Sequence, residues 1–252
     1  MRLVPPLVRG VLIGRRKRFF ADVALSDGTH VVAHCPNPGR LIGCLTPGAE
    51  VVLQGRSSVT RTLPWTWVLV RANRAAWVGV DTSLGVPLVL EAVEAGHLPE
   101  LHGFTHAHRE VVYGREARSR IDLVFSNRER LSVAENARER GPDESVWAEV
   151  KSTTLVRRQG GVRVAAFPDA VTVRGQKHLQ ELEDVVRRRR RAVLVFAVQR
   201  SDPEAFAPAD EIDPDYGRLF RRAVTAGVEV IAISSRVQGD SIALVRRLPI
   251  VL

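Results

Sequence analysis

The stretch VWAEVKSTT, Val146 to Thr154, places two opposite charges inside what otherwise reads as a buried strand. Valine, tryptophan and threonine are residue types that favour strands. Side chains alternate along a strand, so Glu149 and Lys151 share one face of the sheet with Trp147. The stretch therefore predicts a strand that carries a glutamate and a lysine side by side.

A second acidic residue, Asp122, interrupts the apolar run SRIDLVF. If the two strands are neighbours, Asp122 and Glu149 converge at one end of the sheet. Two carboxylates brought together raise the pKa of one of them unless a cation neutralises the pair. Mg²⁺ takes one or two carboxylates together with water and a substrate phosphate, and a lysine beside it can position water and stabilise charge developing on phosphorus. The D…ExK pattern is therefore suited to metal-dependent attack on a phosphodiester.

A second interpretation needs no chemistry. Asp122 or Glu149 could pair with Lys151 or Arg120 as a buried salt bridge that is kept for structure alone. An ExK tripeptide is common, and the pattern by itself supports the two interpretations equally.

The N-terminal third of the chain predicts a small β-barrel. Its short, partly alternating apolar runs are 9–17, 18–25, 29–36, 49–55 and 65–72. Turn signals rich in glycine, proline, asparagine and aspartate separate several of these runs. Five short strands in so short a segment are typical of an OB-type barrel.

The remainder predicts a mixed sheet flanked by helices. A helix near 86–95 precedes strands at 109–114, 119–125 and 147–155, and the polar segment 126–145 is interpreted as a long hairpin loop. A hairpin at Gly160-Gly161, a helix from about Thr172, a strand at 191–199, a helix after the N-cap Asp213 and a strand at 227–233 complete the order. We expect an OB-like domain over 1–80 and an α/β domain over 81–252.

The composition of the chain limits the kinds of partner and compartment that we expect. The chain has 37 basic and 28 acidic residues, a formal net charge of +9 that attracts polyanions. Lys17, Lys151 and Lys177 are its only lysines, so the position of the arginines says more than their number. No apolar run reaches the roughly 18 residues of a membrane span, and two cysteines, Cys35 and Cys44, fit a reduced compartment. We expect a cytoplasmic protein with no membrane partner.

The pattern of strands and charges resembles the PD-(D/E)xK nuclease superfamily. The resemblance implies that Asp122 and Glu149 bind Mg²⁺ or Mn²⁺ and that Lys151 is the catalytic lysine. Many members add an acid from the first helix, a place that Glu91 matches, with Glu94 as the fallback. In related enzymes the helix after the lysine strand supplies polar groups, which here are Arg174, Gln176 and Lys177.

Longer motifs resemble the bacterial and archaeal sugar fermentation stimulation protein A family. In chain order they are KRFFADVALSDGTHVVAHCPNPGRL, TLPWTWVLV, SRIDLVF, AEVKSTTL, FPDAVTVRGQKHL and APADEIDPDYGRLFRRAVTAGVEVIA. The resemblance covers about residues 10 to 235. It implies an OB-like barrel joined to a restriction-endonuclease-like, PD-(D/E)xK domain, and nucleic-acid binding.

Basic residues in two turns are candidates for gripping a phosphate backbone. The segment GRRKRFF sets four of them beside two phenylalanines, a combination that can track phosphates and stack bases. A solvated basic turn is the alternative. The candidates are Arg15, Arg16, Lys17 and Arg18 in this segment, and Arg157 and Arg158 just after the ExK strand. No motif marks His178 or the other histidines, which are interpreted as ordinary surface or core residues.

Two functions follow. The first is a nuclease that depends on Mg²⁺ or Mn²⁺, and the second is a DNA-binding regulator of sugar metabolism that keeps the nuclease fold without cleaving. DNA is expected in preference to RNA. A sugar-handling enzyme has no supporting constellation, because its carboxylates would have to flank a sugar and Lys151 would be unexplained. The sequence leaves the oligomeric state open.

Overall fold

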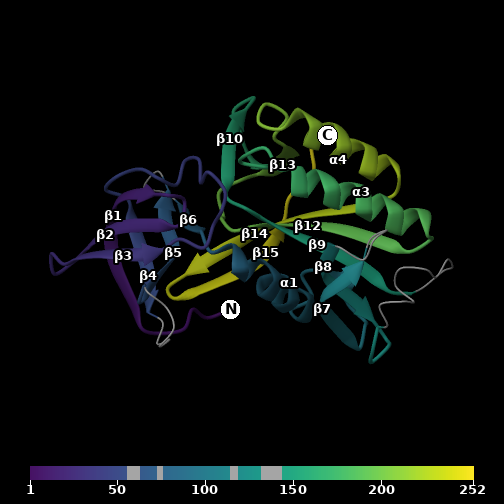
Figure 1. Cartoon of the computed structure of the whole chain (residues 1–252), viewed down its shortest axis with the longest axis horizontal. Coiled ribbons are helices and arrows are strands. Elements are labelled where there is room, and N and C mark those ends of the chain that lie inside the picture. The colour runs from purple at the N-terminus through teal and green to yellow at the C-terminus, as the bar shows by residue number, and fades with distance from the viewer. Residues whose placement is uncertain (56–62, 73–75, 114–118, 132–143) are drawn as a thin grey trace.

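The structure is a computed structural model that describes residues 1–55, 63–72, 76–113, 119–131 and 144–252 (Figure 1). Most of the segment 126–145, interpreted above as a hairpin loop, lies outside the described residues. No helix within the described ranges is long and apolar enough to cross a membrane.

The N-terminal strands close into a barrel, as expected from the sequence. They are β1 (Leu7–Arg16), β2 (Phe20–Leu25), β3 (His30–His34), β4 (Glu50–Gly55), β5 (Trp65–Ala72) and β6 (Ala76–Gly79). The strand order is β3-β2-β1-β4-β5-β6, and β3 also pairs with β5, which closes the first five strands on themselves. Leu12, Val23, Leu53 and Trp67 are buried in the interior of this barrel, which is an OB domain.

A six-stranded mixed sheet forms the centre of the second part of the chain. Its strands are β7 (His106–Tyr113), β8 (Ser119–Ser126), β9 (Val146–Thr153), β12 (Arg191–Val198), β14 (Glu229–Gln238) and β15 (Ser241–Arg247). They lie in the order β15-β14-β12-β9-β8-β7. The pairs β9–β12 and β12–β14 are parallel and the other three are antiparallel, so the predicted mixed sheet is confirmed.

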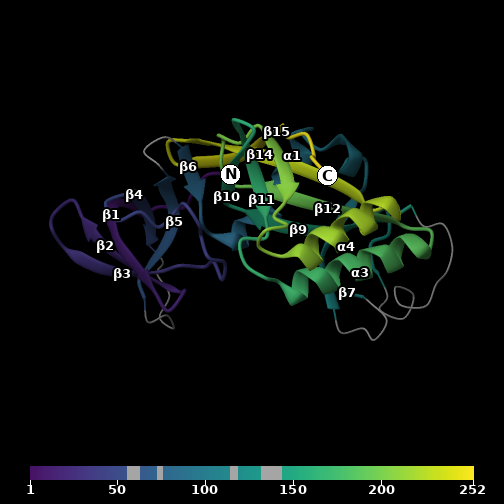
Figure 2. The same ribbon diagram turned by 90° about the horizontal axis from the view of Figure 1, so that it is seen from above.

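Helices cover both faces of this sheet. They are α1 (Gly85–Glu94), α3 (Val173–Arg187) and α4 (Pro214–Thr225), with short 3-10 turns at Thr82–Leu84 and Pro99–Leu101. On β9, Ala148 packs in one core with Leu88 of α1, while its neighbour Trp147 packs in another with Leu179 of α3 and Phe220 of α4. Figure 2 shows α3 and α4 together on one side of the strands. The face of Trp147, and with it of Glu149 and Lys151, is therefore the face covered by α3.

The α/β part also contains a small third sheet, and hydrogen bonds from loops connect the α/β part to the barrel. The sheet contains β10 (Leu155–Gln159), β11 (Val162–Phe167) and β13 (Ala205–Pro208), and β10–β11 is the hairpin predicted at Gly160-Gly161. The amide of Gly79 donates to the carbonyl of Gln199 at 2.8 Å, and that of Leu41 donates to Asp169 Oδ2 at 2.9 Å. The barrel is thus hydrogen-bonded to the α/β part from two places.

Both cysteines are buried and free. Burial raises the pKa of Cys44 to about 11, so this thiol stays protonated.

Candidate active site

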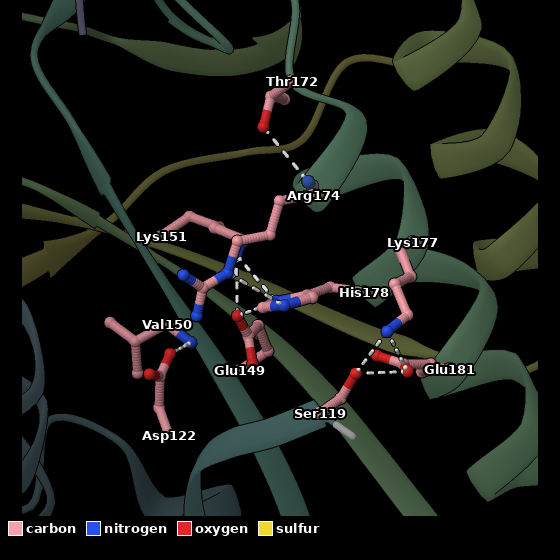
Figure 3. A network of polar contacts seen from close by, with 11 residues as sticks. Ser119, Asp122, Glu149, Val150, Lys151, Thr172, Arg174, Lys177, His178 and Glu181 are labelled. Carbon is pink, nitrogen blue, oxygen red and sulfur yellow. Dashed lines mark hydrogen bonds and ion pairs between the residues drawn. The ribbon is translucent and has the colours of Figure 1, made fainter. Parts of the chain in front are cut away.

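Asp122 and Glu149 lie on adjacent strands, at the point where the pairing of those strands ends. β8 and β9 pair at Leu123↔Ala148 and at the two positions before it along β9. One residue further, Asp122 Oδ2 accepts a hydrogen bond from the backbone N–H of Val150 at 2.7 Å. The side-chain oxygen of Asp122 thus takes the place of a backbone carbonyl of the neighbouring strand as the acceptor of this N–H. This holds the carboxylate of Asp122 beside the strand that carries Glu149 (Figure 3).

Glu149 is buried, with 2% of its surface exposed, and its two carboxylate oxygens have different surroundings. Oε1 accepts from Lys151 Nζ at 2.6 Å and from His178 Nδ1. Oε2 is buried without a hydrogen-bond partner among the described residues. A buried carboxylate oxygen without a partner is costly, and hard divalent cations take oxygen ligands of this kind.

His178 belongs to this site, although the sequence interpretation treated it as an ordinary histidine. It lies on α3, is 5% exposed, and its Nδ1 is 3.1 Å from Lys151 Nζ. Arg174 Nε donates to the other ring nitrogen, Nε2, at 3.4 Å. Nε2 is therefore the acceptor and Nδ1 carries the proton that is donated to Glu149, an assignment made from the network. The sequence did contain a signal that His178 belongs to the site, because it lies one helical turn after Arg174, a predicted site residue, and beside the buried Leu179.

The two carboxylates have opposite pKa shifts. Burial, reinforced by the charge of Glu149, raises the pKa of Asp122 to about 6. Burial would also raise the pKa of Glu149, but Lys151 and His178 outweigh it and hold that pKa below its ordinary value. Glu149 is therefore the ionised member of the pair, and Asp122 is the one that takes up a proton as the pH falls.

The structure does not bring Glu91 to these residues. Its carboxylate pairs with the terminal ammonium of Met1, which also donates to the carbonyl of Ile242 at 2.8 Å. Ile242 lies on β15, at one edge of the sheet, whereas Asp122 lies on β8, next to the opposite edge. Glu94 is exposed on the same helix. No group of three or more histidine, cysteine, aspartate or glutamate side chains in the described ranges could hold a metal, so the candidate ligands reduce to two carboxylates.

Three of the expected nucleic-acid contacts are instead engaged inside the protein. The guanidinium of Arg15 donates to the backbone carbonyls of Arg18, Asn37 and Gly39, so it braces two loops. Arg157 pairs with Glu211 and donates to a backbone carbonyl of β13. Gln176 donates to Asp213, the N-cap of α4. These placements argue against a primary role in phosphate binding for the three residues.

Other basic side chains remain available. Lys17, Arg18 and Arg158 are exposed, and their side chains make no hydrogen bond or ion pair with another described residue. Arg16 pairs with Asp22 at 3.0 Å and lies over the ring of Phe20.

On α3, Arg174 is exposed beside the site. Lys177 donates to Ser119 Oγ at 2.9 Å while half of its side chain stays exposed.

A closed five-stranded OB barrel joined to a restriction-endonuclease-like α/β domain defines the class of this protein. Two family models divide the chain in the same way. The SfsA N-terminal OB domain matches residues 13–80, and the sugar fermentation stimulation protein RE domain matches residues 84–241. The chain belongs to the sugar fermentation stimulation protein family.

Relatives and a solved structure agree over the full length. Sugar fermentation stimulation protein homologs from Pelobacter propionicus and Geobacter metallireducens are each 48% identical over 252 residues, which is 100% of this chain and of theirs. The solved structure of Pyrococcus furiosus SfsA in complex with Ca²⁺ is similar at 25% identity with a TM-score of 0.81, and covers 100% of both chains. The resemblance inferred from the sequence motifs is confirmed.

Proposed function

We propose that this protein binds DNA and that its α/β domain is a phosphodiesterase dependent on Mg²⁺ or Mn²⁺. The observation that carries the catalytic part is the buried Glu149, whose Oε2 has no partner among the described residues and which lies beside Asp122 and Lys151. A purely structural ion pair has no use for a second, partly buried acid with a raised pKa next to it.

DNA binding rests on the barrel, the family and the charge. OB barrels commonly bind strands of nucleic acid with basic and aromatic groups. The net charge of +9 favours a polyanionic partner, and Lys17 and Arg18 at the tip of the β1–β2 hairpin are free to contact phosphates. Phe19 in the same turn is 43% exposed and is a candidate for stacking on a base.

The donor set fits a hard divalent cation. Asp122 and Glu149 would hold Mg²⁺ or Mn²⁺, with water and a substrate phosphate as the other ligands. The relative from Pyrococcus furiosus, solved in complex with Ca²⁺, supports a divalent site in the family. Such a cation, when bound, supplies Lewis-acid stabilisation of the phosphoryl oxygens.

The other residues of the site orient the Glu149 carboxylate and stabilise the negative charge that develops on the substrate. Lys151 Nζ is held by Glu149 Oε1 at 2.6 Å, and it has two further protons to donate to an attacking water or to a phosphoryl oxygen as negative charge develops. His178 fixes the position of the Glu149 carboxylate through Nδ1. Arg174 is fixed in turn by His178, so its guanidinium is in place to contact a phosphate.

A second candidate is a DNA-binding regulator that does not cleave. One observation favours it: Glu149 Oε1, Lys151 and His178 are in polar contact with one another. A buried network kept for structure alone would have the same contacts. It leaves Glu149 Oε2 unexplained.

The test compares the wild type with Lys151→Met, which keeps the apolar stem of the lysine without its charge. Mn²⁺ binding is measured by calorimetry, and cleavage is measured on single- and double-stranded DNA and RNA. We expect both proteins to bind Mn²⁺ and the variant to lose about 100-fold or more in cleavage. Arg236→Ala is the control, because Arg236 is exposed on β14 and its side chain makes no hydrogen bond or ion pair with another described residue.

Mn²⁺ binding without cleavage of any substrate by the wild type would favour the regulator. A folded wild type that binds no divalent cation, with or without DNA, would remove the nuclease.

A further inference from the structure

A cleft of about 440 Å³ lies between the barrel and the α/β domain, and it reaches the candidate active site. Val150 and Lys151 line it, and each is hydrogen-bonded to one of the two candidate metal ligands. The barrel contributes the segment 37–40 and Arg18, while the opposite wall comes from 150–155, 166–167 and 169–172. The cleft is therefore built from both domains.

The charged groups of the cleft favour an anion. Arg18, Arg40 and Lys151 are basic, and Asp169 is the one acidic residue among those that line it. Asp169 already accepts a hydrogen bond from the amide of Leu41. The side chain of Arg40 is exposed and makes no hydrogen bond or ion pair with another described residue, as is also true of Arg18. Two free guanidinium groups at a concave surface are suited to phosphate.

The loop that carries Arg40 is held rigidly. Asn37 donates through Nδ2 to the carbonyl of Val80 at 2.9 Å and accepts the amide of Gly39 at 2.9 Å. Arg15 donates to the carbonyls of Asn37 and Gly39 from the other side. Arg40 is thus presented on a preorganised loop, which lowers the entropy lost when it grips a ligand.

The other lining residues suit a nucleobase. Pro38, Val171 and Phe167 supply apolar surface, and Val171 is 67% exposed. A space of about 440 Å³ is the size of a small-molecule pocket, which is enough for one nucleotide unit. Enzymes that hold a target nucleotide in a pocket take it from a single strand or draw it out of the helix.

We propose that the interdomain cleft is a subsite for one nucleotide of a single strand, with Arg40 and Arg18 holding the phosphate next to the bond that faces Lys151. This inference rests on the proposed function, because it names the form of nucleic acid that enters the same site. The barrel then acts as one wall of the substrate channel in addition to being a separate binding module.

The test measures binding of a labelled oligo-dT of about 16 nucleotides, the upper end of OB-fold site sizes, and of a matched duplex, by fluorescence anisotropy in EDTA. We expect Arg40→Ala and Arg18→Gln each to weaken single-strand binding about tenfold. In each variant the plot of log K against log salt concentration should also become less steep by about 0.7, which is the contribution of one phosphate contact on a single strand. Arg236→Ala should change neither quantity.

Duplex binding should be weaker than single-strand binding and unaffected by Arg40→Ala. A duplex that binds as tightly as the single strand, or single-strand binding that Arg40→Ala and Arg18→Gln leave unchanged, would overturn the inference while leaving a nuclease possible. Arg40-dependent binding by a wild type that cleaves nothing in Mn²⁺ would support the cleft and remove the nuclease. If the wild type binds neither the single strand nor the duplex, both the proposed DNA binding and the cleft subsite would be removed.

Discussion

The protonation state of Asp122 depends on its surroundings in the folded protein. Its carboxylate is held by one backbone N–H, lies near the ionised Glu149, and has a pKa of about 6 in the absence of metal. An unfolded aspartate has a pKa of about 3.9. The folded protein therefore binds this proton more tightly than the unfolded chain does. The stabilisation from protonated Asp122 is complete below about pH 4 and is lost as the pH rises through about 6.

Asp122→Asn is expected to remove this pH dependence. In EDTA the free energy of unfolding of the wild type should fall by up to about 2–3 kcal/mol between pH 4 and pH 7 on account of Asp122, and the variant should lack that fall. Asparagine can still accept from the N–H of Val150. Urea denaturation across this pH range measures the difference, with Asp215→Asn, an exposed aspartate of α4, as the control. Parallel curves for the wild type and Asp122→Asn would contradict the assignment.

At the scale of elements, one buried aspartate joins the two helices on the active-site face. Asp213 is 1% exposed and caps α4 by accepting the N–H of Tyr216 at 2.9 Å. It also accepts the N–H of Thr172 at 2.9 Å and the side chain of Gln176. Thr172 is itself the N-cap of α3, the helix that carries His178 and Arg174. The start of α3, and with it the position of His178, depends on Asp213.

Asp213→Ala should therefore cost more than the loss of an isolated cap. Removing a cap costs about 0.5–2 kcal/mol, and here two further donors lose their acceptor. We expect a loss of about 2–3 kcal/mol in the free energy of unfolding, measured by urea denaturation. Asp215→Ala, two residues on and 69% exposed, should stay within about 0.5 kcal/mol of the wild type. Equal effects of the two substitutions would argue against this bridging role.

At the scale of the whole molecule, the contact between the barrel and the α/β domain is close enough to exclude a methyl group. A Cβ on Gly39 would lie 2.5 Å from Asp169 Oδ1, whereas one on Gly14 would have no heavy atom within 4 Å. A side chain at position 39 would force the carboxylate of Asp169, which accepts the N–H of Leu41, to move.

Gly39→Ala should destabilise the protein by about 1–3 kcal/mol, as overpacking does elsewhere. Gly14→Ala is the matched control and should be neutral or slightly stabilising. In the double variant Gly39→Ala/Asp169→Ala the overlap is relieved, so its loss should be smaller than the sum of the two single losses. Additive losses, measured by urea denaturation of all four proteins, would show that the two residues are not in contact.

Some elements that the sequence missed are strands whose pattern is weak. β13 has four residues and runs from alanine to proline, and β6 is equally short. β15 mixes arginine with apolar residues because it is the edge of the sheet, where one side of the ladder faces outward. Short or edge strands gain their structure from the neighbour with which they pair, and that neighbour is distant in the sequence.

By itself the sequence determined the barrel, the mixed sheet and the shared face of Glu149 and Lys151, because alternation, turn residues and caps act over a few positions. Only the tertiary structure decided which charged groups meet. It placed His178 against Glu149 and removed Glu91 to the far edge of the sheet. It also engaged Arg15 in loop contacts and brought Arg40 to the cleft beside Lys151. Such encounters depend on how helices and domains pack across the sheet, and the local pattern of one segment carries no information about its distant partners.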